Sequence, residues 1–346
     1  MTSKELIYNT VQLHPTDRQA VALLSGGSWV LNTHGLSQRD MLTTDSEKTA
    51  SILFNTYTDI GSDIIWGAPG SGNLVVGALG GHLNFTSKGP SNVSEAPLKS
   101  LEDIEDIIKH VDLDVLKTNT ALSKLRDITG LIVQKAGSNY VTGGTVWGPV
   151  TLAGLLFGVE KFMRGIYKNP GAVHRLLDWT ADIFIAYAES YIENGIGFIS
   201  MGEPNSSGDM ISKKHFREFA FPALKKVFAA LKLKNIITCL HICGNTEDRL
   251  DLIAETGVSL FSMDYKVNMT KARSALGGKI AFAGNVDPVA VMLNETQDGV
   301  EHACIQCINE ATESGCNGFI LMPGCDLPPA TPVENVKKMM SMGRKN

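Results

Sequence analysis

The chain has 346 residues, a formal net charge of −5, 43% hydrophobic residues and 19% charged residues. It has no cluster of Lys and Arg and no apolar run of membrane-spanning length, which argues against nucleic-acid binding and membrane insertion. The first residues hold no apolar segment of signal-peptide length, so we expect a cytoplasmic protein whose six cysteines are reduced, buried or metal-bound.

Short apolar runs that favour strands alternate with longer helical patterns, such as 44–61, 169–195 and 212–232. The predicted strands are 28–33, 62–67, 140–146, 197–202, 235–241, 258–263, 279–284 and 317–322. Eight strands with alternating helices, most of them apolar enough for burial on both faces, predict an α/β protein with a (β/α)8 TIM barrel. A doubly wound open sheet is the alternative, but no GxGxxG turn follows the first predicted strand.

The whole chain, 1–346, is expected to form a single barrel domain. Residues 1–24 read as an N-terminal helical extension that packs outside the barrel. The Gly-rich segment after the second predicted strand, 68–100, is too long for a simple connection. We expect it to contain a β-hairpin and to form an inserted cap over the barrel mouth.

A His and a Cys stand two residues apart where the fifth predicted strand ends. Residues i and i+2 of an extended segment point to the same side, so His241 and Cys243 aim an imidazole and a thiol at one point. Cys325 follows the eighth predicted strand and would face the same barrel mouth. One nitrogen and two sulfur ligands with a fourth position open are typical of catalytic zinc.

The other cysteines have simpler interpretations. Cys304 and Cys307 have the spacing of a metal-binding knuckle, but they share one apolar face of an apparent helix and have no partner pair. Cys239 lies deeper along the strand that carries His241. We expect all three to be core residues.

Acidic residues also follow the predicted strands. Glu203, after the fourth strand, could complete the zinc site at rest or orient His241 from outside it. Asp209, in the next loop, could play the same part or bind substrate, and the alternative is that it caps the helix starting near Ser212.

Four more polar or aromatic residues stand at the predicted mouth and are candidates for substrate binding. They are Trp147, Asp264, Asn285 and Asp287. The alternative for Asp264, Asn285 and Asp287 is that they hydrogen-bond the backbone of their own loops.

Several segments together resemble the uroporphyrinogen decarboxylase superfamily. They are TGGTVWGPVTLAGLLFG, SSGDMIS, AFAGNVDP and GFILMPGCDLPPATPVENV, and the resemblance covers nearly the whole chain. His241, Cys243 and Cys325 look like the H-x-C…C zinc signature of its methyltransferase branch, which includes methylcobamide:coenzyme M methyltransferases. The decarboxylases of the superfamily instead carry an Arg-rich loop after the first strand, whereas this chain has WVLNTHGLSQRD there.

The resemblance implies a zinc-dependent methyltransferase that transfers a methyl group from a methylated corrinoid to a thiol such as coenzyme M, or to tetrahydrofolate. No D-x-H-x-x-G corrinoid-binding segment occurs, so methylcobalamin is expected to arrive on a separate corrinoid protein. The sulfonate of coenzyme M would need a positive or amide-lined pocket, to which no residue is assigned. A tetrapyrrole carboxylate decarboxylase and a non-catalytic barrel that binds a corrinoid or a partner protein are the alternatives.

Overall fold

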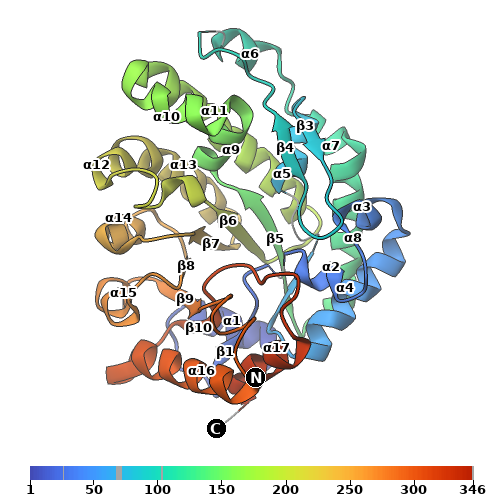
Figure 1. Cartoon of the computed structure of the whole chain (residues 1–346), viewed down its shortest axis with the longest axis vertical. Coiled ribbons are helices and arrows are strands. Elements are labelled where there is room, and N and C mark those ends of the chain that lie inside the picture. Colours follow the sequence, from blue (N-terminus) through green and yellow to red (C-terminus); the bar gives the residue numbers. More distant parts are fainter. Residues whose placement is uncertain (26, 68–71, 103, 345–346) are drawn as a thin grey trace.

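Eight parallel strands form a nearly closed barrel surrounded by helices (Figure 1). This computed structural model describes residues 1–25, 27–67, 72–102 and 104–344. The barrel strands are β1 (Ala20–Val21), β2 (Ile64–Trp66), β5 (Val141–Trp147), β6 (Phe198–Gly202), β7 (Ile237–Ile242), β8 (Leu260–Met263), β9 (Ala281–Val286) and β10 (Phe319–Pro323). They pair in the order β1-β10-β9-β8-β7-β6-β5-β2, always in parallel. The predicted (β/α)8 barrel is confirmed.

The barrel closes between β1 and β2 through Asp63, which directly precedes β2. The backbone N–H of Asp63 donates to the carbonyl of Val21 (2.9 Å), and the Asp63 carboxylate accepts from the N–H of Val21 (3.0 Å). Arg18 donates to both carboxylate oxygens, at 2.6 and 2.9 Å. This ion pair, whose carboxylate is buried, therefore completes the barrel at the N-terminal ends of its strands, opposite the end where active sites of this fold lie.

The helices lie around the outside of the barrel (Figure 1). They are α1 (Ser3–Val11), α2 (Trp29–Asn32), α3 (Gln38–Thr43), α4 (Ser46–Ile60), α6 (Ile104–His110), α7 (Val115–Thr118), α8 (Thr120–Ala136), α9 (Pro149–Phe157), α10 (Val159–Lys168), α11 (Pro170–Ile192), α12 (Lys213–His215), α13 (Phe221–Lys232), α14 (Leu250–Ala254), α15 (Met269–Leu276), α16 (Gln297–Thr312) and α17 (Val333–Ser341). Some are packed on the strands and others, such as α6, α7 and α10, are packed on neighbouring helices. The predicted helices at 44–61, 169–195 and 212–232 are confirmed as α4, α11 and the pair α12 and α13. Within the described ranges, no helix has both the length and the apolar composition needed to cross a bilayer.

The first predicted strand is wrong. Residues 28–33 contain the short helix α2, and the first strand is β1, inside the segment expected to be helical. Only the earlier part of that segment, α1, is a helix. A short apolar run has no periodicity that separates strand from helix, and here the first residues of the buried run, Ala20 to Ala22, hydrogen-bond to β10. The other seven predicted strands are confirmed to within two residues at each end.

The segment after β2 contains α5 (Gly72–Ala78) and an antiparallel hairpin, β3 (His82–Asn84) with β4 (Asn92–Glu95), as expected for 68–100. Residues 68–71 of that segment lie outside the described residues. Asn73 links this segment to the barrel, because its side chain accepts a hydrogen bond from Trp147 Nε1 at 2.7 Å and donates to the carbonyl of Ser91. We name residues 72–95 the cap.

Candidate metal centre

Strand β7 and the loop after β10 bring one imidazole and two thiols together. His241 lies inside the barrel near the end of β7, Cys243 follows that strand, and Cys325 follows β10. His241 Nε2 lies 3.0 Å from Cys243 Sγ, which lies 3.4 Å from Cys325 Sγ. Within the described ranges, this is the one group of at least three His, Cys, Asp or Glu side chains whose ligand atoms all lie within 4.8 Å of one another.

The other ring nitrogen of His241 is held by the neighbouring strand. Ser262 on β8 stands opposite His241 in the sheet register. Its carbonyl oxygen and hydroxyl oxygen lie 3.2 and 3.1 Å from His241 Nδ1. A carbonyl can only accept, so this contact favours the tautomer with the proton on Nδ1 and leaves the Nε2 lone pair facing the two thiols.

The donor set fits a zinc ion. Two sulfur ligands of one tetrahedral zinc lie about 3.7 Å apart, close to the separation found here, whereas a disulfide would need about 2 Å. A hydrogen bond with Cys243 and then burial raise the pKa of the Cys325 thiol, because both make the charged thiolate unfavourable at this place. A bound cation would remove that penalty. Burial acts to lower the pKa of His241, but its hydrogen bond to Cys325 and the nearby carboxylates give a net rise.

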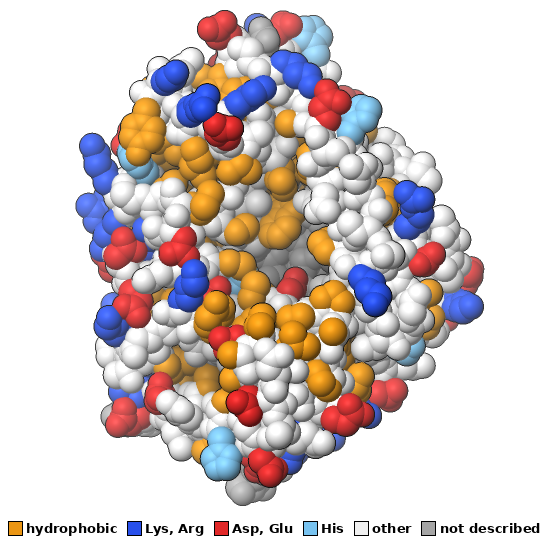
Figure 2. Space-filling model, in the orientation of Figure 1, with side chains coloured by type: hydrophobic (Ala, Val, Ile, Leu, Met, Phe, Trp, Pro, Cys, Tyr) orange, Lys and Arg blue, Asp and Glu red, His pale blue; other side chains and the backbone are white. Residues whose placement is uncertain are grey.

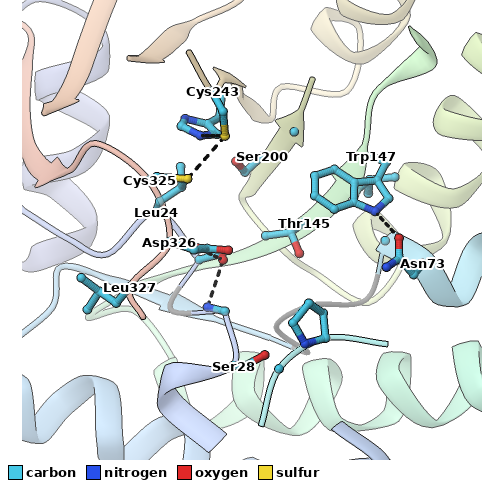
Figure 3. Close-up of a pocket in the computed structure, with 18 of the residues that line it drawn as sticks. Leu24, Ser28, Asn73, Thr145, Trp147, Ser200, Cys243, Cys325, Asp326 and Leu327 are labelled. Carbon is cyan, nitrogen blue, oxygen red and sulfur yellow. Dashed lines mark hydrogen bonds between the residues drawn. The ribbon is translucent and has the colours of Figure 1, made fainter. Parts of the chain in front are cut away.

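The three residues lie in the wall of a cavity of about 370 Å³ at the C-terminal end of the strands. The space-filling view shows a hollow in this face, bordered by hydrophobic side chains (Figure 2). Residues from the barrel and from the cap line the cavity together. Apolar and small polar lining residues include Leu24, Ser28, Asn73, Thr145, Trp147, Ser200 and Leu327 (Figure 3).

Asp326 is a residue of this cavity that the sequence analysis did not single out. It directly follows Cys325, and its carboxylate points into the cavity, on the side of Thr145 (Figure 3). Its Oδ1 accepts from the hydroxyl of Ser25 at 2.6 Å. Although protein atoms surround the group and raise its pKa, its side chain remains open to the cavity. The only signal for Asp326 in the sequence is its position next to Cys325, a candidate ligand.

Glu203 does not join the group of His241, Cys243 and Cys325. It is fully buried, and its two carboxylate oxygens accept from the N–H groups of Val150 and Thr151, at 2.8 and 2.9 Å, and from the Thr151 hydroxyl. Its contacts therefore revise the expectation of a fourth ligand or a partner of His241: Glu203 binds the first turn of α9. Gly148 makes room for it, since a Cβ there would lie 2.4 Å from Glu203 Cγ.

Asp209 lies away from the cavity as well. Its carboxylate pairs with Lys266 at 2.8 Å near the surface. It does not cap α12 either, because the N-cap is Ser212, whose own hydroxyl accepts from the N–H of His215.

The remaining candidates divide between the cavity and the loops. Trp147 lines the cavity. By contrast, Asp264 and Asp287 accept from backbone N–H groups of their own loops, and Asn285 donates to the carbonyls of Asp264 and Val267. The structure therefore favours the loop alternative for Asp264 and Asp287, whereas Asn285, near the end of β9, holds the backbone of the neighbouring loop after β8.

The remaining cysteines are separate from the site. Cys304 and Cys307 are buried on α16, and Cys239 is buried inside the barrel below His241. All six cysteines are free thiols. The core interpretation of Cys239, Cys304 and Cys307 agrees with these positions.

The whole chain is similar to proteins of known activity. The family model described as uroporphyrinogen decarboxylase (URO-D) matches residues 16–345. A methylcobamide:CoM methyltransferase of Methanosarcina mazei is 30% identical, over 99% of this chain and 98% of that protein. A uroporphyrinogen decarboxylase of Prochlorococcus marinus is 27% identical, over 82% of this chain and 76% of that protein. A solved structure of a methyltransferase from Methanosarcina mazei matches with a TM-score of 0.88 and 26% identity, over 99% of this chain and 98% of that one.

Proposed function

Because this chain belongs to the uroporphyrinogen decarboxylase (URO-D) family, and is similar over its full length to a methylcobamide:CoM methyltransferase, we propose that it is a zinc-dependent methyltransferase. It would transfer a methyl group from a methylated corrinoid protein to a small thiol. The observation that carries the proposal is the grouping of His241, Cys243 and Cys325 in the wall of the cavity.

His241 Nε2 and the two Sγ atoms would hold the ion, which leaves a fourth position for the substrate. When bound there, Zn²⁺ would lower the pKa of the substrate thiol, so that a thiolate exists at neutral pH. The two cysteine thiolates would offset the charge of the ion and so keep the substrate sulfur nucleophilic.

The other residues of the site orient and shield the reactants. Ser262 holds the ring of His241, while Trp147 and Leu327 give the cavity apolar walls that exclude water. In the reaction the thiol gives up its proton, a carbon–sulfur bond forms, and the carbon–cobalt bond breaks with both electrons remaining on cobalt. The corrinoid would be brought to the barrel mouth by a separate protein, because this sequence has no D-x-H-x-x-G corrinoid-binding segment.

We also propose a cytoplasmic location. Cys243 and Cys325 must both be reduced to act as ligands, and their sulfurs lie only 3.4 Å apart. A reducing compartment keeps such a pair from being oxidised to a disulfide.

The decarboxylase alternative is less well supported by the cavity. The carboxylates of a tetrapyrrole need several cationic partners. Among the described residues that line the cavity, Lys88 is the only Lys or Arg. The cavity therefore suits a small thiol better than a polyanionic tetrapyrrole.

Metal content and methyl transfer test the proposal together. Purified wild-type protein is expected to hold about one zinc per chain and to demethylate methylcobalamin when a thiol is added, followed by the cobalamin absorbance. Cys325→Ser should lose most of the zinc and lower the rate by more than roughly 100-fold, because loss of a ligand exceeds the 10–100-fold effects seen for outer groups. Cys316→Ser, at a half-buried cysteine outside the group, is the matched control and should behave as the wild type.

Two results would contradict the proposal. One is full zinc occupancy in Cys325→Ser. The other is a zinc-loaded wild type that fails to demethylate methylcobalamin, whether a thiol or tetrahydrofolate is added. Turnover of uroporphyrinogen would then favour the decarboxylase, and methylcobalamin binding without turnover would favour the non-catalytic barrel.

A further inference from the structure

The charge of the cavity restricts which thiol it can accept, if the proposed methyl transfer to a thiol is right. Asp326 is next to a ligand and points into the cavity. The Ser25 hydroxyl donates a hydrogen bond to Asp326 Oδ1, whereas no described residue donates one to Asp326 Oδ2. The open oxygen lies beside Gly27, where a Cβ would stand 3.0 Å from Oδ2. One carboxylate oxygen is therefore free to accept a hydrogen bond from a bound molecule.

The other charges do not compensate for this carboxylate. Two cysteine thiolates balance the charge of a zinc ion, and a bound substrate thiolate would add a negative charge. Lys88, the cationic residue among the described lining residues, is exposed on the cap and forms no ion pair with a described residue. A thiol with an anionic tail would therefore bring a further negative charge close to Asp326.

We propose that Asp326 selects a short thiol whose tail is a cationic ammonium group, an aminothiol, over one whose tail is a sulfonate. The ammonium would donate to the open Oδ2, while the sulfur occupies the position beside His241, Cys243 and Cys325. In this respect the chain would differ from the relatives whose names specify coenzyme M, a thiol with a sulfonate. Asp326 would thus be a determinant of specificity in the substrate site.

Three thiols that differ only in the group on the second carbon test the proposal. Cysteamine carries an ammonium, 2-mercaptoethanol a hydroxyl and coenzyme M a sulfonate. Calorimetric titration of the zinc-loaded protein gives the Kd of each thiol independently of turnover, and methylcobalamin demethylation gives kcat/KM. We expect binding to weaken in the order cysteamine, 2-mercaptoethanol, coenzyme M, with cysteamine at least roughly tenfold tighter than coenzyme M.

Asp326→Asn provides the decisive comparison, because the amide keeps the size of the side chain and removes its charge. The ratio of the Kd of coenzyme M to that of cysteamine should fall by at least about tenfold, with zinc content and melting temperature unchanged. The 2-mercaptoethanol affinity should change least. Lys88→Gln, the matched change of the other charge at the cavity, should not alter the preference for cysteamine.

Preferred binding of coenzyme M by the wild type, lost in Lys88→Gln, would overturn the proposal and leave the methyltransferase function standing. An equal loss of activity with all three thiols in Asp326→Asn would also overturn it, because it would indicate a role in proton removal. The expected order of Kd values without any methyl transfer would support the role of Asp326 while contradicting the proposed reaction.

Discussion

The contact between Ser262 and His241 orients the ring of a proposed metal ligand. A histidine ligand needs its coordinating nitrogen free of a proton, and the strand opposite supplies the acceptor that places the proton on Nδ1. The sequence motif around His241 and Cys243 predicts the ligand types. It does not identify this partner, which lies on the next strand and depends on the register of β7 with β8.

Ser262→Ala is expected to weaken zinc binding about tenfold, because the ring of His241 loses one of its two acceptors while the Ser262 carbonyl remains. Competition with a chromogenic chelator measures the affinity. Ser274→Ala, at an exposed serine of α15, is the control. Equal affinities in wild type and Ser262→Ala would show that the carbonyl alone positions the ring.

Among the elements, α9 shows why an acidic residue at the barrel mouth need not be a ligand. Its first turn has free N–H groups and a positive end, and Glu203 from the end of β6 accepts from two of them. From sequence alone, Glu203 looks like a ligand because it follows a strand. Only the position of α9 beside β6 shows that its oxygens are already used.

Glu203→Gln should change how stability depends on pH. Burial raises the pKa of Glu203 from an ordinary 4.5 to about 7, against the opposing hydrogen bonds from Thr151 and Val150. The folded state therefore binds the proton more tightly, and the stability contributed by this group falls as pH rises from 4.5 to 7 and is level above that. Glutamine does not titrate, so the variant lacks this loss of stability. The free energy of unfolding of the variant minus that of the wild type should therefore increase by roughly 3 kcal/mol as pH rises from 4.5 to 7.

Urea unfolding between pH 4.5 and 8 measures this difference. At any single pH the variant also loses one acceptor for the α9 N–H groups, so the pH trend rather than the offset is the test. Glu218→Gln, at an exposed glutamate, should show no such trend relative to the wild type. A constant difference for Glu203→Gln across the range would contradict a raised pKa.

On the scale of the whole molecule, the two ends of the barrel have separate tasks. The cavity and the group of His241, Cys243 and Cys325 lie at the C-terminal ends of the strands, whereas the ion pair of Arg18 and Asp63 joins β1 to β2 at the other end. A substitution that weakens the closure of the barrel should therefore leave the chemistry of the site unchanged, and the reverse.

Asp63→Asn is expected to lower the free energy of unfolding by about 2–3 kcal/mol, because it removes the buried counter-charge of Arg18, whose guanidinium is itself partly exposed to water. Chemical denaturation measures the loss. Zinc content below the unfolding transition should match the wild type. Asp59→Asn, at an exposed aspartate of α4, controls for the loss of a charge, and zinc loss in Asp63→Asn alone would show that the two ends are coupled.

The sequence by itself determined the barrel and pointed to His241, Cys243 and Cys325 as candidate ligands. Apolar runs long enough for buried strands recur between amphipathic helices, and the alternation of side chains along a strand places His241 and Cys243 on one side. Only the tertiary structure decided where the first strand lies, what Glu203 binds and that Asp326 faces the cavity. Each of these depends on contacts between segments distant in the chain, β1 with β10, Glu203 with α9 and Asp326 with Ser25, which local sequence pattern does not encode.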